Sequence, residues 1–171
     1  MKKIAILICI LFWGVQAYAW NSDILKLSLW GQAKSVGIPF NTPQVTGIEI
    51  GLGANLNEVN GLQANILYGM AGKLTGIQIS VISRSNNITG LQIGFRNISY
   101  QTLYGVQVGF FNKSIETKGV QIGLINLSDR FAGLQLGAIN KSCNLTGLQI
   151  GLFNIIENGP IPSMIGLNGR F

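Results

Sequence analysis

The sequence predicts an all-β protein, a short β-solenoid of about eight coils of 14–15 residues with a cap at each end. Two observations lead to this fold class. A unit of the form Gly-apolar-Gln-apolar-Gly-apolar-x-Asn recurs along most of the 171 residues, at intervals of 14 or 15. Within each unit, apolar residues alternate with Gly or Gln, and a period of two is typical of a strand. Repetition at a nearly fixed interval indicates one coil per copy, with like residues stacked on like.

The first residues have the layout of a secretory signal peptide. Lys2 and Lys3 precede an apolar run from Ile4 to Trp13, which is too short to span a bilayer. The small-residue site Ala17-Tyr18-Ala19 follows, and we expect cleavage after Ala19 and export of the mature chain. Loss of the two lysines changes 12 Lys+Arg against 6 Asp+Glu to 10 against 6, a mature net charge of +4.

The chain therefore divides into four parts. Residues 1–19 are the expected signal peptide, and residues 20–46 an N-terminal cap or first strand. Residues 47–154 hold the eight repeats, and residues 155–171 a C-terminal cap or last strand. Caps are expected because the first and last coils of a solenoid otherwise leave open sheet edges.

Three positions of the repeat are nearly invariant. The copies begin with Gly47, Gly61, Gly76, Gly90, Gly105, Gly119, Gly133 and Gly147, and we expect a bend at each because glycine readily turns a corner. The third position carries Glu49, Gln63, Gln78, Gln92, Gln107, Gln121, Gln135 and Gln149. The eighth carries Asn97, Asn112, Asn126, Asn140 and Asn154 in the last five copies, but Ala54, Tyr68 and Ser83 in the first three. Stacked amides hydrogen-bond from coil to coil, so both series predict ladders, with the asparagines at a turn.

The alternation assigns two faces to each strand. In the last copy, Leu148 and Ile150 point to one side and Gln149 to the other, and we expect the apolar pair to fill a thin core. The same assignment buries Ile122 and exposes Gln121. The glutamine row would then line a shallow outer face. That face is either a solubilising ladder or a candidate binding face for an envelope or extracellular polymer, or for a protein strand.

One alternative fold fits the same repeats, an outer-membrane β-barrel of about ten strands. A copy less a turn of about four residues leaves about ten, the length of a tilted membrane strand. Segments Ile24 to Gly31 and Ser163 to Phe171 would complete an even number of strands. The solenoid is favoured because antiparallel neighbours would not place like residues side by side. The apolar residue two positions before most of the glycines, and turns of nearly constant length, also fit a barrel poorly.

The composition indicates no enzyme. The chain has no His, so it lacks an imidazole base and a His metal ligand, and its six carboxylates are scattered. The glycine-rich stretches lack the Lys-Ser/Thr of a phosphate-binding loop. Cys143 is the single cysteine of the expected mature chain and has no evident activating partner. We expect no cofactor and no metal and, because the basic residues form no cluster, no nucleic-acid partner.

The repeated unit GLQIGLFN (Gly147 to Asn154) resembles the exported surface-repeat proteins first noted in leptospires and found in other envelope-bearing bacteria. The flanks LKLSLWGQ (Leu25 to Gln32) and residues 154–171 are similar to that family's flanks. The resemblance implies an exported protein of the cell surface or outer membrane, says almost nothing about activity, and supplies no site residue. The expected export also leaves the periplasm open. A structural or binding role is expected. The alternative fold would instead make the chain a membrane anchor or a narrow pore.

Overall fold

The computed structural model describes residues 22–30, 34–38 and 41–171. The expected signal peptide, residues 1–19, lies outside these described residues. The described strands are β1 (Asp23–Trp30), β2 (Lys34–Ile38), β3 (Gln44–Ile79), β4 (Ile82–Ile122), β5 (Ile125–Leu136), β6 (Ile139–Ile156) and β7 (Ser163–Arg170). Within the described residues, no helix has the length and apolar character needed to cross a membrane.

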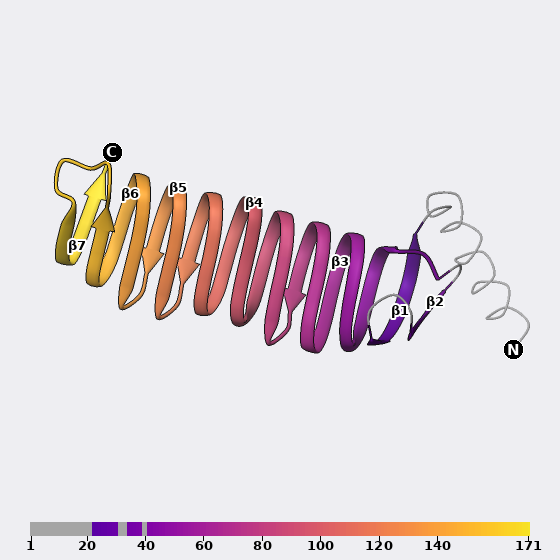
Figure 1. The fold of residues 1–171 in the computed structure, drawn as a ribbon. Coiled ribbons are helices and arrows are strands. Elements are labelled where there is room, and N and C mark those ends of the chain that lie inside the picture. Colours follow the sequence, from indigo (N-terminus) through magenta and orange to yellow (C-terminus); the bar gives the residue numbers. More distant parts are fainter. Residues whose placement is uncertain (1–21, 31–33, 39–40) are drawn as a thin grey trace, which may run out of the picture.

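The chain winds as a solenoid. β3 and β4 each run through several coils without a break, and the coils stack along one axis (Figure 1). Neighbouring coils pair in parallel and in register, so that Gln78 lies beside Gln92 and Gln121 beside Gln135. This pairing confirms the predicted all-β solenoid. The antiparallel arrangement required by the alternative fold occurs among the described strands only at the two ends of the sheet.

Antiparallel strands flank the stack of coils at both ends. The sheet order is β2-β1-β3-β4-β5-β6-β7. β1 pairs in parallel with the start of β3 and antiparallel with β2, and β7 returns antiparallel along β6. Each end of the stack is therefore paired with a strand of opposite direction.

The leading glycine of every copy forms a corner that no other residue fits. All eight have φ between 131° and 147°, a conformation that side chains rarely permit. A Cβ on Gly119, for example, would lie 1.9 Å from the carbonyl oxygen of Gly105. The other leading glycines stand equally close to the coil before them. The coils can stack at strand spacing only because this corner carries no side chain.

The interior contains the glutamine row. Gln63, Gln78, Gln92, Gln107, Gln121, Gln135 and Gln149 are all 0% exposed, as are Asn97, Asn112, Asn126, Asn140 and Asn154. A second interior row is formed by the residue that precedes each leading glycine by two positions: Val45, Val59, Leu74, Ile88, Leu103, Thr117, Phe131 and Leu145. The corner glycine brings this mainly apolar row and the glutamine row to the same side of the chain wall.

The assignment of faces made from the sequence is therefore wrong. Ile150 is 40% exposed and Leu148 is half-buried, whereas Gln149 is fully buried. Period two separates two faces but does not say which one lies inside. The interior accepts the amides because every coil supplies a partner for the next, so burying them leaves few hydrogen bonds unmade.

This reversal predicts the outcome of two neighbouring substitutions. Gln121→Ala leaves the amides of Gln107 and Gln135 without their partner in the interior. The expected cost is about 3–5 kcal/mol of unfolding free energy, from two buried polar groups at about 1–3 kcal/mol each plus a small cavity. Ile122→Asp changes a side chain that is 40% exposed and should cost less than about 1 kcal/mol. Urea unfolding followed by circular dichroism measures both, and a larger loss for Ile122→Asp would restore the original assignment.

Candidate functional site

The glutamines form one continuous ladder. From Gln78 to Gln149, each Nε2 donates a hydrogen bond of 2.6–2.8 Å to the Oε1 atom of the glutamine in the preceding coil. Ser142 also accepts a hydrogen bond of 3.1 Å from Gln149 Nε2, and Ser114 one of 3.2 Å from Gln121 Nε2. The ladder ties successive coils together in the interior.

The asparagines form a second ladder with the opposite direction. From Asn97 to Asn140, each Nδ2 donates to the Oδ1 atom of the asparagine in the following coil over 2.8–2.9 Å. Nδ2 also donates to a backbone carbonyl of that coil, as Asn112 does to Ile122 at 2.9 Å. A Cβ on Gly123 would lie 2.6 Å from Asn112 Nδ2 and 2.2 Å from the carbonyl oxygen of Gly109. Glycine at the fifth position thus provides the space for asparagine at the eighth.

The early copies fill this corner differently. Asn65 occupies the fifth position of the second copy, and its Nδ2 donates to Glu49 Oε2 at 2.7 Å. Ser80 occupies it in the third copy, where its hydroxyl hydrogen-bonds with that of Ser83 at 2.8 Å. A polar side chain at the fifth position thus stands in for the asparagine at the eighth. The asparagine ladder spans the last five copies only.

Glu49 is the first member of the glutamine row and is fully buried. Burial raises the pKa of Glu49, while a hydrogen bond from Asn65 and the charge of Lys26 oppose that rise. Lys26 of β1 is the register partner of Glu49. The row of neutral amides therefore ends in charged groups at the N-terminal end.

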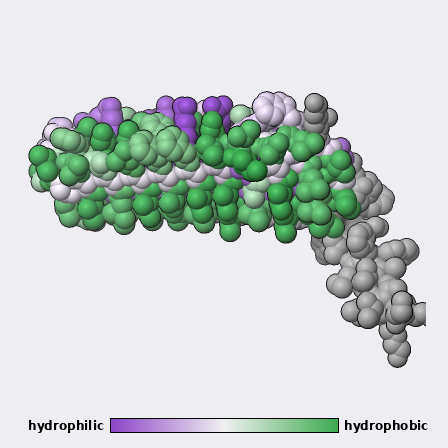
Figure 2. All heavy atoms as spheres, turned by 90° about the horizontal axis from the view of Figure 1, so that it is seen from below, coloured by the Kyte–Doolittle hydropathy of each residue, from purple (hydrophilic) through white to green (hydrophobic). Residues whose placement is uncertain are grey.

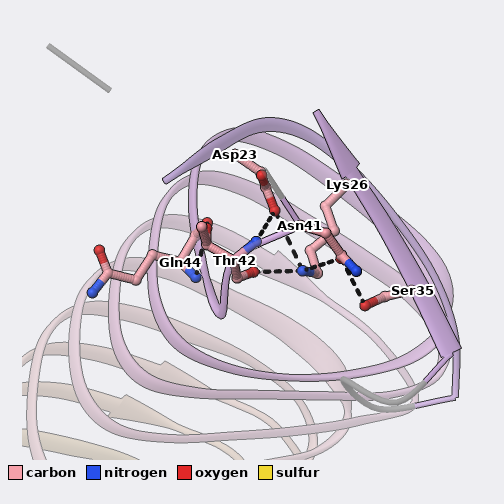
Figure 3. A network of polar contacts seen from close by, with 6 residues as sticks. All are labelled: Asp23, Lys26, Ser35, Asn41, Thr42 and Gln44. Atoms are coloured by element: carbon pink, nitrogen blue, oxygen red, sulfur yellow. Dashed lines mark hydrogen bonds and ion pairs between the residues drawn. The ribbon is translucent and has the colours of Figure 1, made fainter. Parts of the chain in front are cut away.

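Lys26 is held by the segment that closes this end of the interior (Figure 3). Its Nζ lies 3.4 Å from Asp23 Oδ2 and donates to Asn41 Oδ1 at 3.1 Å and to the carbonyl of Thr42. The amide of Thr42 donates to the same Asp23 oxygen at 2.7 Å. Asn41 adopts φ of 56°, a left-handed conformation that asparagine tolerates. Paired charges rather than an apolar plug thus close the polar interior.

The glutamine row cannot bind a polymer in this structure, because its amides are buried and bonded to one another. The expectation that Glu49 and Gln63 to Gln149 line an outer face is corrected accordingly. The asparagine row, Asn97 to Asn154, is equally buried. Both rows are structural, and any binding surface must lie elsewhere.

The outer surface contains a large apolar region, part of which, at the second and fourth positions of the copies, was expected in the core. We call it the apolar arc: the side chains at the second, fourth, sixth and seventh positions of the copies. The second and fourth positions carry Ile48, Ile50, Leu62, Ala64, Ile77, Ile79, Leu91, Ile93, Val106, Val108, Val120, Ile122, Leu134, Leu136, Leu148 and Ile150. The sixth and seventh carry Leu52, Gly53, Ile66, Leu67, Val81, Ile82, Phe95, Arg96, Phe110, Phe111, Leu124, Ile125, Ala138, Ile139, Leu152 and Phe153. Figure 2 shows apolar side chains gathered along the length of the solenoid, with hydrophilic ones along one border.

Two consecutive outward residues, at the sixth and seventh positions, form a corner within the arc. Phe95 is 59% exposed, Ile66 65% and Leu152 63%. The rings of Phe95 and Phe110 stack with centroids 4.9 Å apart and planes 11° apart. The corner is thus a ridge of large apolar side chains that point into solvent.

A hollow interrupts the arc near its N-terminal end. It has a volume of about 560 Å³ and is lined mostly by apolar side chains, among them Leu27, Leu29, Ile50 and Ile66. Ala64 contributes to it, at a position where the other copies carry Val, Leu or Ile. The small side chain of Ala64 leaves room there.

The remaining side of the coil, at the eleventh and twelfth positions, is polar. It carries exposed or half-buried ion pairs between Glu58 and Lys73 at 3.0 Å and between Glu116 and Arg130 at 2.8 Å. Cys143 lies on this side, where hydrogen bonding with the Glu157 carboxylate and burial raise the pKa of its thiol. A raised pKa lowers the reactivity of a cysteine. Among the described residues, no group of three or more Cys, Asp or Glu could hold a metal ion.

Comparison of the chain with protein-family models, with curated proteins and with solved structures finds no match. A sequence signal for the apolar arc does exist. The sixth and seventh residues, as in Phe110-Phe111, are both apolar, and two adjacent apolar residues cannot both enter a core on a single strand.

The buried carboxyl of Glu49 predicts a pH dependence. Because its pKa is raised above the ordinary value of 4.5, the folded chain binds this proton more tightly than the unfolded chain does. The stabilisation by the proton is complete below pH 4.5 and is lost as the pH rises through the raised pKa. Glu49→Gln cannot titrate, so we expect it to gain stability relative to the wild type as the pH rises from 4.5, in urea titrations.

Glu58→Gln is the control for this experiment. A hydrogen bond from Lys73 lowers the pKa of Glu58, so its stabilisation is present above pH 4.5 and lost as the pH falls. Relative to the wild type, Glu58→Gln should therefore lose stability as the pH rises, the opposite of Glu49→Gln. The effect is small because the Glu58–Lys73 pair is exposed. A difference in unfolding free energy between Glu49→Gln and the wild type that stays constant with pH would contradict the raised pKa of Glu49.

Proposed function

We propose that the protein is an exported, non-enzymatic structural element of the bacterial cell envelope, a rod that binds another envelope component through its apolar arc. The observation that carries the proposal is the inverted polarity of the coils. Amides fill much of the interior, and isoleucine, leucine, valine and phenylalanine side chains cover one whole side of the outer surface. Monomeric soluble proteins rarely expose contiguous apolar patches above a few hundred Å².

The size of the arc supports a docking role. The eight leading glycines stack one on another, and seven intervals at strand spacing extend about 34 Å. The arc spans about six residues of each coil, or about 20 Å. The resulting area of about 700 Å² exceeds what an isolated protein normally leaves in water. Covering half of it would contribute about 9 kcal/mol at 25 cal/mol per Å².

The ladders support a role as a stiff scaffold. Each coil is bonded to the next by backbone pairing and, in the last five copies, by two rows of amides. Networks of satisfied buried hydrogen bonds rigidify a structure. The rod can therefore present its arc as one fixed surface rather than as a set of independent loops.

Export is supported by the sequence alone. The lysine-led apolar run before Ala19 has the layout of a signal peptide, and the repeats resemble those of exported surface proteins. The proposal thus places the rod outside the cytoplasmic membrane, at the cell surface, at the outer membrane or in the periplasm.

The test is fractionation of a diderm bacterium that expresses the full chain. We expect cleavage after Ala19, measured by mass spectrometry, and recovery of the rod with the envelope fraction. Phe95→Asn with Phe110→Asn should lower the envelope-bound to free ratio at least about a hundredfold, because two buried phenylalanines contribute about 3–6 kcal/mol.

Tyr100→Asn with Ile115→Asn is the matched control. These side chains are 47% and 41% exposed but lie on the polar side of the coil, so the ratio should stay unchanged. An uncleaved cytoplasmic chain would overturn the placement. Equal ratios for the two double variants would overturn the role of the arc.

A further inference from the structure

Resting on the proposed function, we propose that the component bound by the apolar arc is a lipid bilayer with anionic headgroups, in whose interface the solenoid lies lengthwise. The apolar side chains of the arc do not by themselves distinguish a bilayer from another apolar partner. The choice of a bilayer rests on charge: unpaired cations lie at the borders of the arc, whereas the charges on the opposite side are mostly paired.

The carboxylates lie away from the arc. Asp23 and Glu49 are buried, and the other four carboxylate side chains occupy the eleventh or twelfth position of their copies: Glu58, Glu116, Asp129 and Glu157. Three of these four form ion pairs, with Lys73, Arg130 and Lys141. The side opposite to the arc is thus nearly neutral.

Four cations without an ion pair lie within the arc or at its borders, whereas Arg170 of β7 donates to the carbonyl of Asn158 at the C-terminal end. Arg84 and Lys113 occupy the ninth position, next to the corner of the arc, and Arg96 the seventh. Lys118 borders the other edge, where it directly precedes a leading glycine. None of these four forms an ion pair with a described residue. Arg96 lies 5.6 Å from the ring centroid of Phe111, and Lys118 5.5 Å from that of Tyr104.

This arrangement matches an interfacial protein. Long basic side chains beside an apolar surface extend their charge toward headgroups while their carbon stems stay in apolar surroundings. Arg84 opens on a hollow of about 280 Å³ that Tyr100 and Asn86 also line, and its Nε has no hydrogen-bond partner. A guanidinium at such a border suits the level of phosphate groups.

A second copy of the chain fits the arc less well. The estimated area of about 700 Å² is close to the 800 Å² that each partner of a stable dimer buries, so area does not decide. The charge distribution decides, because two arcs in contact would bring the four unpaired cations of each copy together without a carboxylate inside either arc. The arc is also convex, since it bends around the ridge of Phe95 and Phe110. A ridge enters a fluid interface more readily than it fits a second ridge.

Flotation with lipid vesicles tests the proposal. The exported protein is mixed with vesicles of phosphatidylcholine, with or without about one quarter phosphatidylglycerol, and separated on a density gradient. Lys113→Gln with Lys118→Gln removes two border charges and should weaken binding to the anionic vesicles about twenty-five-fold, roughly fivefold per charge. All variants share the same N-terminus, so differences between them report the solenoid.

Lys73→Gln with Arg130→Gln is the control, because it removes the same charge from the polar side and breaks only exposed ion pairs. It should leave vesicle binding unchanged. Equal weakening by both pairs, or equal binding of the wild type to neutral and anionic vesicles, would overturn the charged-interface proposal and leave the apolar docking role intact.

Two further outcomes separate the proposals. No vesicle binding, together with oligomers in sedimentation that Phe95→Asn with Phe110→Asn dissolves, would make a second copy the partner and overturn the lipid inference alone. A monomer that binds no vesicle and is unaffected by these substitutions would overturn the docking function as well.

Discussion

The stacking of identical amides from coil to coil is the interaction on which the rest of the structure depends. A buried amide without partners costs about 1–3 kcal/mol, so an interior of glutamines exists only if each one meets another. Parallel, in-register coils meet this condition, because Gln121 then lies between Gln107 and Gln135. The leading glycines permit it, since a Cβ at any of them would collide with the coil before. Repetition in the sequence is therefore a hydrogen-bonding requirement.

The two ladders complement each other. Glutamine donors point toward the preceding coil and asparagine donors toward the following one, so the two rows of amide dipoles run in opposite directions. Their fields oppose along the axis, and a long stack need not accumulate a large net dipole. Only the glutamine row extends through the early copies, and at that end it reaches Glu49 beside Lys26. Glu49 accepts a hydrogen bond from Asn65 there, and Lys26 is paired with Asp23.

The repeat spacing was sufficient to predict the coil, its parallel stacking and the amide ladders, because all three depend on position along the chain. It was not sufficient to predict the inside. Leu148 and Gln149 alternate under either assignment, and the usual preference of leucine for a core pointed the wrong way. Two features of the sequence do indicate which face lies inside. Leu145 lies on the glutamine side of the corner glycine, and Leu152-Phe153 are adjacent apolar residues that no single core can take. The charged closure at Lys26 joins residues from separate segments, which no repeat pattern encodes.

The inverted polarity links the interior to the surface. An amide core that satisfies its own hydrogen bonds needs no water, and its bonds strengthen when the surroundings become less polar. The exposed apolar side chains, in contrast, are unfavourable in water and favourable in an apolar medium. Moving the arc from water to an apolar partner therefore lowers the free energy of the exposed side chains without weakening the hydrogen bonds of the interior. The same transfer would be unfavourable for a protein with a leucine core and a polar surface, because its surface groups would be left without hydrogen bonds. The arrangement of these coils is thus suited to a boundary between water and an apolar phase, with the polar row of Glu58, Lys73, Glu116 and Arg130 on the side that stays in water.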